Sequence, residues 1–542
     1  MSTLNSKIRI CKGIKLDKNY NNTLSYHESD ILSLCESQDH LIASSNTYSF
    51  IRTRGVIQTG FTYSQGLQAN YMAFQNPDYD NKWFFAFVDN VNYMSNGCAE
   101  FEYTIDVWST WWDYWHVGKC FVLREHAESD TIGEHTIPEN LDIGEVYCEQ
   151  ETEDASYYNT TYWIGMLTNY VINDNSTESS SDKGLQFAGA MSVYNNVVFG
   201  NQLIFFPIYM LSSFNDIRLY ILRTNVDGYS ADIQNIFIIP NAVMPLASSL
   251  VQHTASVVGH DFNWYTASFT DTPATFNTTI TKRHSFTGYT PKNNKCFVYP
   301  YNYLLVTNNQ GSHNIYKYED FDTTNCVFQN QMAISVGISG RLVPKNYKGM
   351  ITNDDEALPL GKYPTCAWSS DAYINWLTQN SVNLAVNTTT SLIGAGIGFA
   401  SGVGVASTTL GLFNSIGNTI DAFHKASLLP NIEGGQPTGD VTWASNRNCF
   451  TFKEMRAKIE YIKIIDDFFT RYGYRMNRVK VPNLYGRTYW NYIQIDKDDN
   501  VGYGTVPSMY MEEINNIARK GTTIWHNHAD IGNFSLNNTI VT

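Results

Sequence analysis

The segment from Trp83 to Val107 has the sequence WFFAFVDNVNYMSNGCAEFEYTIDV. Its first six residues, Trp83–Val88, form an uninterrupted apolar run, which is typical of a strand buried on both faces. A turn follows at Ser95-Asn96-Gly97, and from Ala99 onward apolar and polar residues alternate, which predicts a half-buried hairpin strand. The outward positions of this strand are acidic: Glu100, Glu102 and Asp106. The segment therefore predicts β-structure for roughly the first 150 residues.

The composition extends this prediction to the whole chain. A chain of 542 residues is too long for one core and is expected to form two to four domains. Aromatic residues make up 14% of it and charged residues only 16%, which favours a mainly β fold with minor α content and extensive buried contacts. The net charge of −15 argues against tight binding of nucleic acid, although it allows a surface past which DNA slides.

Four tryptophans follow the hairpin at the spacing of one helix face: Trp108, Trp111, Trp112 and Trp115. Such a stripe is far more often core than a ligand site.

Residues 150–330 are polar with short apolar runs and predict a second β-rich domain, with an exposed loop at Asn173–Asp182. Near the C-terminus the pattern predicts a helix over Tyr461–Tyr472 that stops at Gly473. It also predicts strands over Tyr474–Lys480 and Tyr489–Ile495.

One segment has the composition of a membrane helix. No Lys, Arg, Asp or Glu occurs from Ala372 to Ile420, and the segment Leu392–Phe413 (LIGAGIGFASGVGVASTTLGLF) carries six glycines. About 20 apolar residues suffice to cross a bilayer, and glycines four residues apart allow close helix packing. The predicted membrane-penetrating residues are Leu392, Ile393, Gly394, Gly396, Ile397, Gly398, Phe399, Gly402, Val403, Gly404, Val405, Leu410, Leu412 and Phe413. A buried helical hairpin in a large core is the alternative, but six glycines are costly inside an ordinary soluble helix.

No enzyme motif is present. The sequence lacks a P-loop, a GxSxG elbow and an HExxH helix, so we expect no catalytic, cofactor or metal site. Asp496, Asp498 and Asn500 imitate a calcium loop, but Val501 and Pro507 stand where glycine and glutamate belong, and a turn is expected instead. The pair His526 and His528 has no identifiable third ligand, so hydrogen-bonded histidines are expected there.

Two further groups of residues bear on location and partners. The nine cysteines are scattered without a CxxC pair, and the first residues lack a secretory signal, which predicts reduced core cysteines in a protein made in the cytosol. Basic and tyrosine residues interleave from Arg471 to Lys480, as in a nucleic-acid patch. Because a strand is predicted there, we favour pairing with acidic residues of a neighbouring subunit. The basic members are Arg471, Arg475, Arg478 and Lys480.

Several segments resemble one family of phage proteins. In the N-terminal part these are YMAFQNPDYDNKWFFAFV (Tyr71–Val88), IDVWSTWW (Ile105–Trp112) and FVLREH (Phe121–His126). In the C-terminal part they are FFTRYGYRMNRVKVPNL (Phe468–Leu484), NYIQ (Asn491–Gln494), TIWH (Thr523–His526) and DIGNFS (Asp530–Ser535). In this order they resemble the tail-knob, or distal tail-tube, proteins of small short-tailed bacteriophages of the Picovirinae kind. A long glycine-rich apolar insertion upstream of the last group is also a feature of that family.

The resemblance implies a homohexameric ring at the distal end of the phage tail. It implies β-barrel tube domains from residues 1–150, 331–385 and 449–542, an inserted β-rich knob domain at 151–330, and a membrane-active loop at 386–448. The loops would plug the tube and then penetrate the host cytoplasmic membrane, so that double-stranded DNA passes through. The protein would be made in the host cytoplasm and joined to the upper tail tube or collar. The alternative is a tail-associated cell-wall hydrolase or receptor-binding protein in which the apolar segment is core.

Overall fold

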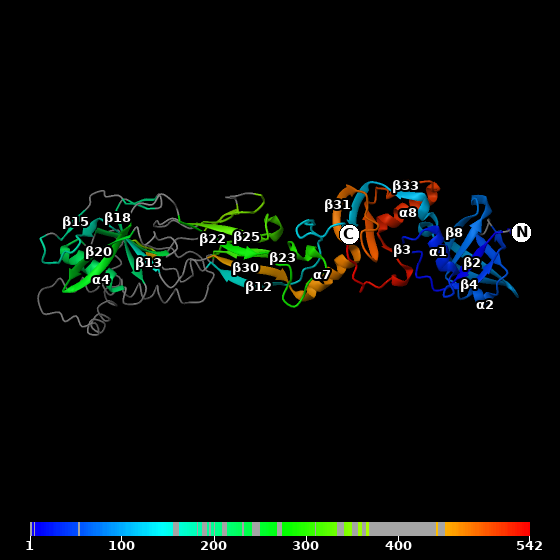
Figure 1. Ribbon diagram of the computed structural model, residues 1–542, viewed down its shortest axis with the longest axis horizontal. Coiled ribbons are helices and arrows are strands. Elements are labelled where there is room, and N and C mark those ends of the chain that lie inside the picture. Colours follow the sequence, from blue (N-terminus) through cyan, green and yellow to red (C-terminus); the bar gives the residue numbers. More distant parts are fainter. Residues whose placement is uncertain are drawn as a thin grey trace. The chain divides into compact units, whose positions relative to one another are not determined.

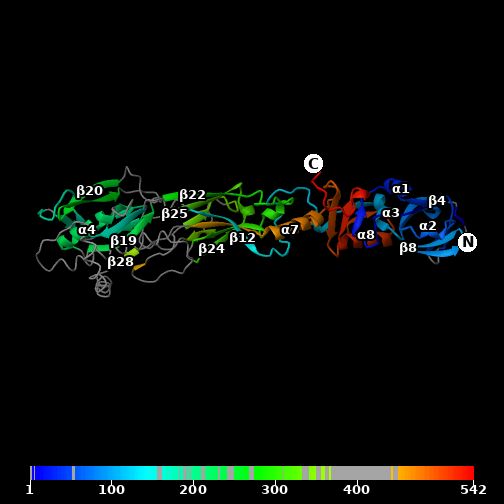
Figure 2. The same ribbon diagram turned by 90° about the horizontal axis from the view of Figure 1, so that it is seen from below.

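The structure is a computed structural model that is mainly β (Figures 1 and 2). It describes residues 3–4, 6–51, 55–154, 162–181, 183–186, 192–194, 197–199, 201–208, 214–229, 232–240, 250–267, 274–308, 311–332, 341–349, 356–359, 365–367, 441–442 and 450–541. The prediction of a mainly β chain with minor helix is confirmed.

The chain forms two compact units. Unit 1 combines Met1–Val146, His284–Tyr301 and Ala457–Thr542, and unit 2 combines Tyr147–Arg283 with Asn302–Arg456. Residues 284–301, which the sequence analysis assigned to an inserted domain, thus belong to unit 1. The division into five segments at residues 150, 330, 385 and 448 stays a prediction.

An eight-stranded antiparallel sheet forms the N-terminal part of unit 1. Its order is β1-β5-β6-β9-β8-β7-β2-β4. The strands are β1 (Thr3–Leu4), β5 (Tyr48–Ile51), β6 (Val56–Thr59), β9 (Cys98–Ile105), β8 (Lys82–Ser95), β7 (Tyr71–Asn76), β2 (Ile8–Cys11) and β4 (Leu41–Ser45). Strands β8 and β9 are the predicted hairpin: Ser95 pairs with Cys98, and Gly97 takes the positive φ of +85° that the tight turn needs.

The second sheet of unit 1 joins the two ends of the chain. Its order is β3-β34-β32-β11-β31, and β3 pairs with β34 in parallel. The strands are β3 (Asn22–Leu24), β34 (Thr522–Trp525), β32 (Trp490–Ile495), β11 (Cys120–Glu125) and β31 (Tyr474–Lys480). Strand β31 has the predicted bounds, and β32 begins one residue later than predicted. A short pair, β10 (Trp115–Val117) with β33 (Gly502–Gly504), lies outside it.

Helices pack on these sheets. They are α1 (Glu28–Glu36), α2 (Tyr63–Gly66), α3 (Val107–Trp111), α7 (Ile459–Tyr472) and α8 (Ser508–Lys520). The predicted helix over Tyr461–Tyr472 is confirmed as α7, which ends at Gly473 with φ +64°. Its buried face carries Ile462, Ile465 and Phe469.

The tryptophan stripe is core, as predicted. All four of its members are at least nine-tenths buried and belong to one hydrophobic cluster. They do not share one continuous helix, however: α3 ends at Trp111, a 3₁₀ turn spans Trp112–Tyr114, and Trp115 begins β10.

The prediction of an acidic outer face on β9 is wrong at two of three positions. Glu100 is buried and accepts a hydrogen bond from Gln58 Nε2 at 2.7 Å. Asp106 is buried as the N-cap of α3, where it accepts from Ser109 N at 3.1 Å and from the Tyr71 hydroxyl at 2.7 Å. Buried carboxylates persist only with such partners, and local alternation gives no sign of them.

Unit 2 contains a seven-stranded sheet in the order β20-β21-β18-β13-β19-β28-β29. The strands are β20 (Leu250–Val257), β21 (His260–Ala267), β18 (Gln202–Ile208), β13 (Tyr162–Thr168), β19 (Ile233–Pro240), β28 (Thr365–Ala367) and β29 (Val441–Thr442). Helix α4 (Phe214–Asp227) packs on it through Ile217, Tyr220 and Ile221, which contact a cluster with Trp264 and Phe206.

The described part of unit 2 also contains two four-stranded sheets and two small hairpins. The four-stranded sheets share a core that includes Leu304, Phe328, Leu342 and Phe452. The first sheet contains β12 (Val146–Glu153), β30 (Thr451–Ala457), β23 (Asn302–Thr307) and β24 (His313–Tyr316). The second contains β22 (Ala274–Thr281), β25 (Asn325–Met332), β26 (Arg341–Pro344) and β27 (Leu358–Pro359). The hairpins are β14 (Tyr170–Ile172) with β15 (Gly184–Gln186), and β16 (Ser192–Tyr194) with β17 (Val197–Phe199). These elements confirm that the middle of the chain is β-rich.

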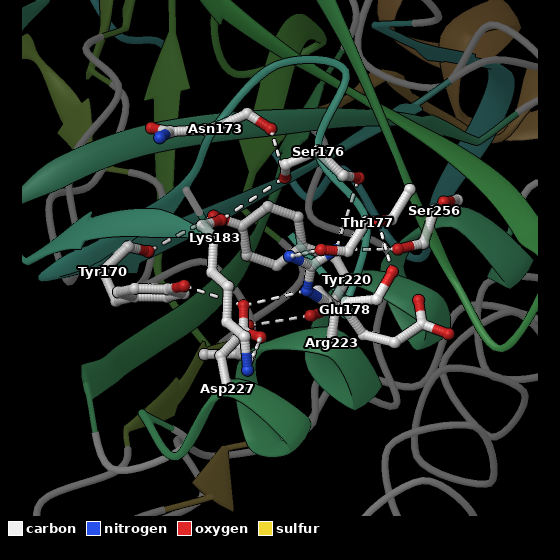
Figure 3. A network of polar contacts seen from close by, with 12 residues as sticks. Tyr170, Asn173, Ser176, Thr177, Glu178, Lys183, Tyr220, Arg223, Asp227 and Ser256 are labelled. Carbon is white, nitrogen blue, oxygen red and sulfur yellow. Dashed lines mark hydrogen bonds and ion pairs between the residues drawn. The ribbon is translucent and has the colours of Figure 1, made fainter. Parts of the chain in front are cut away.

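A buried arginine fastens the loop predicted at Asn173–Asp182 to unit 2 (Figure 3). Arg223 of α4 is fully buried, pairs with Asp227 at 2.9 Å and donates to the carbonyl oxygens of Ser176, Thr177 and Ser256. The described part of the loop has mostly exposed or half-buried side chains, but Ser176 is buried. Its backbone hydrogen-bonds to the edge strand β20, from Asn175 N to Thr254 O and from Ser256 N to Ser176 O. The loop therefore covers that sheet edge.

Candidate functional site

The predicted membrane-penetrating residues, Leu392 to Phe413, lie outside the described residues. The same holds for the rest of the predicted loop at 386–448, except for Val441 and Thr442. Within the described ranges, no helix is both long enough and apolar enough to cross a bilayer.

The strands on either side of this segment lie next to each other. Strand β28 comes before it and β29 comes after it, and the two pair antiparallel, with Thr365 opposite Thr442 and Cys366 opposite Val441. Strand β28 also pairs with β19, so the segment between residues 367 and 441 leaves and re-enters the seven-stranded sheet at one edge. These two anchoring strands were not predicted, because strands of two or three residues are too short to show a periodic pattern in the sequence.

The exposed part of the β8–β9 hairpin carries polar and acidic side chains beside the exposed Tyr93 and Met94. Asp89 forms an ion pair with Lys18 at 3.3 Å and accepts from the Thr104 hydroxyl, and Glu102 accepts from Asn92 at 2.8 Å. Ion pairs at exposed positions contribute little to the free energy of unfolding. The pair of Asp89 with Lys18 partly neutralises the charge of this surface.

The basic cluster finds acidic partners within its own chain. Arg471 pairs with Asp467 one turn earlier on α7 at 2.9 Å, and Lys480 pairs with Glu125 at the end of β11. The Arg475 backbone amide donates to Glu139 at 2.8 Å. Helix spacing and strand pairing thus supply carboxylates to Arg471 and Lys480 within the chain, and the pairing with a neighbouring subunit stays a prediction.

The histidine pair and the aspartate loop are structural. His526 faces the Ser25 hydroxyl at 2.9 Å and Asn491 Oδ1 at 3.1 Å, and His528 Nε2 accepts from Lys15 N at 3.0 Å. Burial lowers the pKa of His526, and it lowers the pKa of His528 to about 4, so both rings are neutral near pH 7. The Asp496 carboxylate accepts from Asp498 N in a turn after β32. Both predictions for these residues are confirmed.

The described cysteines fit the prediction of reduced core residues. Cys11, Cys35, Cys120, Cys296 and Cys326 are buried and free, whereas Cys98 and Cys148 are partly exposed and free. Burial raises the pKa of the Cys120 and Cys326 thiols to about 12, which makes them unreactive.

Comparisons with known proteins agree on one family. Residues 263–539, just over half of the chain, match the family model of the C-terminal domain of Bacillus phage phi29 tail knob protein gp9. Residues 4–115 match the N-terminal region of caudoviral major tail proteins. Tail knob protein gp9 of Bacillus phage PZA is 24% identical, over 99% of this chain and 98% of its own length. The phi29 protein of that name is 25% identical, over 87% of this chain and 88% of its own.

A solved structure shares the fold. The tail knob protein gp12 of bacteriophage C1 superposes with a TM-score of 0.65 over 99% of this chain and 100% of its own, at 15% identity. Together with the β-rich units described above, these matches define a structural protein of a phage tail, not an enzyme. The chain belongs to the phage tail knob protein family that includes gp9 of Bacillus phage phi29.

Proposed function

We propose that the chain forms the distal tube and knob of a phage tail as a homohexamer through which the genome is ejected. The apolar segment Leu392–Phe413 plugs the tube before ejection and then penetrates the host cytoplasmic membrane. One observation carries the proposal: the connection between the paired strands β28 and β29 contains a charge-free segment of membrane length. Such a segment is able to change its surroundings without disturbing the strands that hold it.

A ring of six copies would shield the apolar segments from water, which a single copy cannot do. An exposed apolar segment of this size is an association site, and several copies around an axis bury each other. In a bilayer the same segments pack through glycines four residues apart, Gly394, Gly398 and Gly402. The net charge of −15 suits a conduit for DNA, because an acidic wall repels phosphates. The ring would also bind the proteins of the upper tail tube or collar.

Removal of residues 390–419 tests the membrane role. The deletion should leave folding and oligomerisation largely intact, since both flanking strands stay in place and loop length affects closure entropy only slowly. It should abolish release of dye from liposomes. Deletion of Asn431–Gly439 is the matched control: it shortens the same connection outside the apolar segment and should leave leakage unchanged.

Single substitutions sharpen the test. Gly398→Asp and Val403→Lys should also abolish leakage, because a charge at mid-bilayer costs about 2.5 to 3.5 kcal/mol per copy. Gly398→Ala and Val403→Leu are the uncharged controls and should leak like the unaltered protein. A deleted protein that unfolds would show that the segment is core. A deleted protein that still releases dye would place the membrane activity elsewhere.

A further inference from the structure

A cavity of about 550 Å³, lined mostly by polar residues, lies within unit 1. Its wall comes from His126 and residues 128–131 after β11, from 292–294, from Thr470 of α7, from Arg487, and from 537–540. This volume falls in the range of small-molecule sites, about 300 to 1,000 Å³. Nearly all of the lining side chains carry amide, hydroxyl or charged groups.

Arg487 lines this cavity with an incompletely satisfied guanidinium group. The residue is only 8% exposed, and its two hydrogen bonds are long: Nη1 to Asn538 O at 3.4 Å and Nη2 to Ala127 O at 3.3 Å. Its Nε atom is buried and has no hydrogen-bond partner in the described parts of the chain. Burial lowers the pKa of this guanidinium, which reflects the cost of keeping the charge there. Each Nη atom carries a second N–H, which has capacity for a further acceptor.

Asp130 supplies the opposite chemistry in the same cavity. Its carboxylate accepts from the Tyr474 hydroxyl at 2.6 Å and from Asn294 N at 3.1 Å, and burial raises its pKa. Each carboxylate oxygen has capacity for a further donor. Asp130 and Arg487 interact electrostatically, since each carries a charge that shifts the pKa of the other, but no ion pair joins them among the described residues.

A ligand of this cavity has to accept hydrogen bonds from Arg487 and donate hydrogen bonds to Asp130. An oxyanion accepts from Arg487 but would confront the Asp130 carboxylate, and a cation has the reverse difficulty. A sugar hydroxyl both donates and accepts, so neighbouring hydroxyls satisfy both groups and the surrounding amides. We propose that this cavity is a saccharide-binding site in which Arg487 donates to one ring hydroxyl and Asp130 accepts from another. This proposal is independent of the membrane segment and of the hexamer.

Saturation-transfer NMR on the full chain tests the site. The probes are glucose, galactose and N-acetylglucosamine at about 10 mM, which detects a Kd near 1 mM, a weak affinity of about 4 kcal/mol. Glycine and inorganic phosphate are the zwitterion and oxyanion comparisons. We expect at least one sugar to give a signal and neither comparison compound to do so.

Two variants and a control locate the binding. Thr539→Trp places a large side chain at an exposed position of the cavity wall, and Arg487→Met removes the guanidinium; each should weaken sugar binding at least tenfold. Thr505→Trp, at an exposed threonine of unit 1 outside this wall, should bind like the unaltered protein. If Arg487→Met does not fold, Thr539→Trp decides alone.

The overturning results are equally definite. Absence of a signal from all three sugars, or an equal signal from all variants, would show that the cavity holds only solvent or that binding occurs elsewhere. Binding of phosphate or glycine without any sugar, lost in the cavity variants, would replace the saccharide by an anionic or zwitterionic ligand.

Discussion

His126, at the residue scale, is expected to couple stability to pH. The ring is almost fully buried, its Nδ1 accepts from Tyr492 N at 2.8 Å, and its Nε2 donates to Thr470 O at 3.0 Å. Burial, reinforced by the positive charge of Arg487, lowers its pKa to about 3. Below the ordinary histidine pKa of about 6.5, His126 is protonated in the unfolded chain but stays neutral in the folded chain. The free energy of unfolding is therefore highest above pH 6.5 and falls as the pH drops toward 3.

The loss should approach about 1.4 kcal/mol per pH unit between pH 6 and 4. His126→Gln keeps an acceptor and a donor but does not titrate. Urea titrations of both proteins at several pH values provide the measurement, and the stability difference between them should shrink as the pH falls. Parallel curves would mean that other groups carry the acid sensitivity.

Gly473 and Gly97 form a matched pair for backbone strain. Both have positive φ, +64° and +85°. A Cβ atom at Gly473 would lie 2.0 Å from Glu125 O, whereas one at Gly97 would meet nothing within 4 Å. We expect Gly97→Ala to cost about 1 kcal/mol and Gly473→Ala at least twice that, because the second also forces β11 and α7 apart. Chemical denaturation measures both. Equal costs would show that the contact with Glu125 relaxes freely.

The loop over β20 is expected, at the element scale, to depend on Arg223 (Figure 3). Arg223→Met leaves Asp227 buried without its closest cation, which should cost about 3 to 5 kcal/mol. It also releases the loop carbonyls, so backbone amides of residues 254–258 should exchange hydrogen faster, and the uncovered edge should favour self-association. Lys183→Met is the control: Lys183 is partly exposed and 3.9 Å from Asp227, so we expect less than about 1 kcal/mol. Unchanged exchange in Arg223→Met would contradict the role of the loop.

Elements with a local signal were predictable, and contacts between distant segments were not. The β8–β9 hairpin, helix α7 with its stop at Gly473, and strand β31 follow from periodicity and turn chemistry over a few residues. Burial of Glu100 depends on Gln58 from another strand, and the lining of the polar cavity comes from five segments up to about 400 residues apart. A pattern of a few residues does not indicate which distant segments will come into contact. The membrane role of Leu392–Phe413 is predicted from apolar length alone and stays a prediction.

The purified protein is expected, at the scale of the whole molecule, to be a ring of six chains. Sedimentation or light scattering at micromolar concentration should give the mass of six chains, and electron microscopy should show a lumen wide enough for hydrated duplex DNA with more acidic than basic side chains. The physical reason is that the apolar segments need mutual burial and that the DNA must pass without adhering. A monomer at that concentration, or a strongly basic lumen, would contradict this prediction.

The pairing of β3 with β34 also determines when, during translation, this part of the sheet can form. Strand β3 ends at Leu24, and its partner begins at Thr522, so about 500 residues must be translated in between. At about 5 to 20 residues per second this takes roughly half a minute to two minutes. Three of the five strands of this sheet, β31, β32 and β34, come only after residue 473 and are missing for most of that time. Strand β3 therefore stays without its partner until residues 522–525 have been made, and a truncation before Thr522 removes that partner.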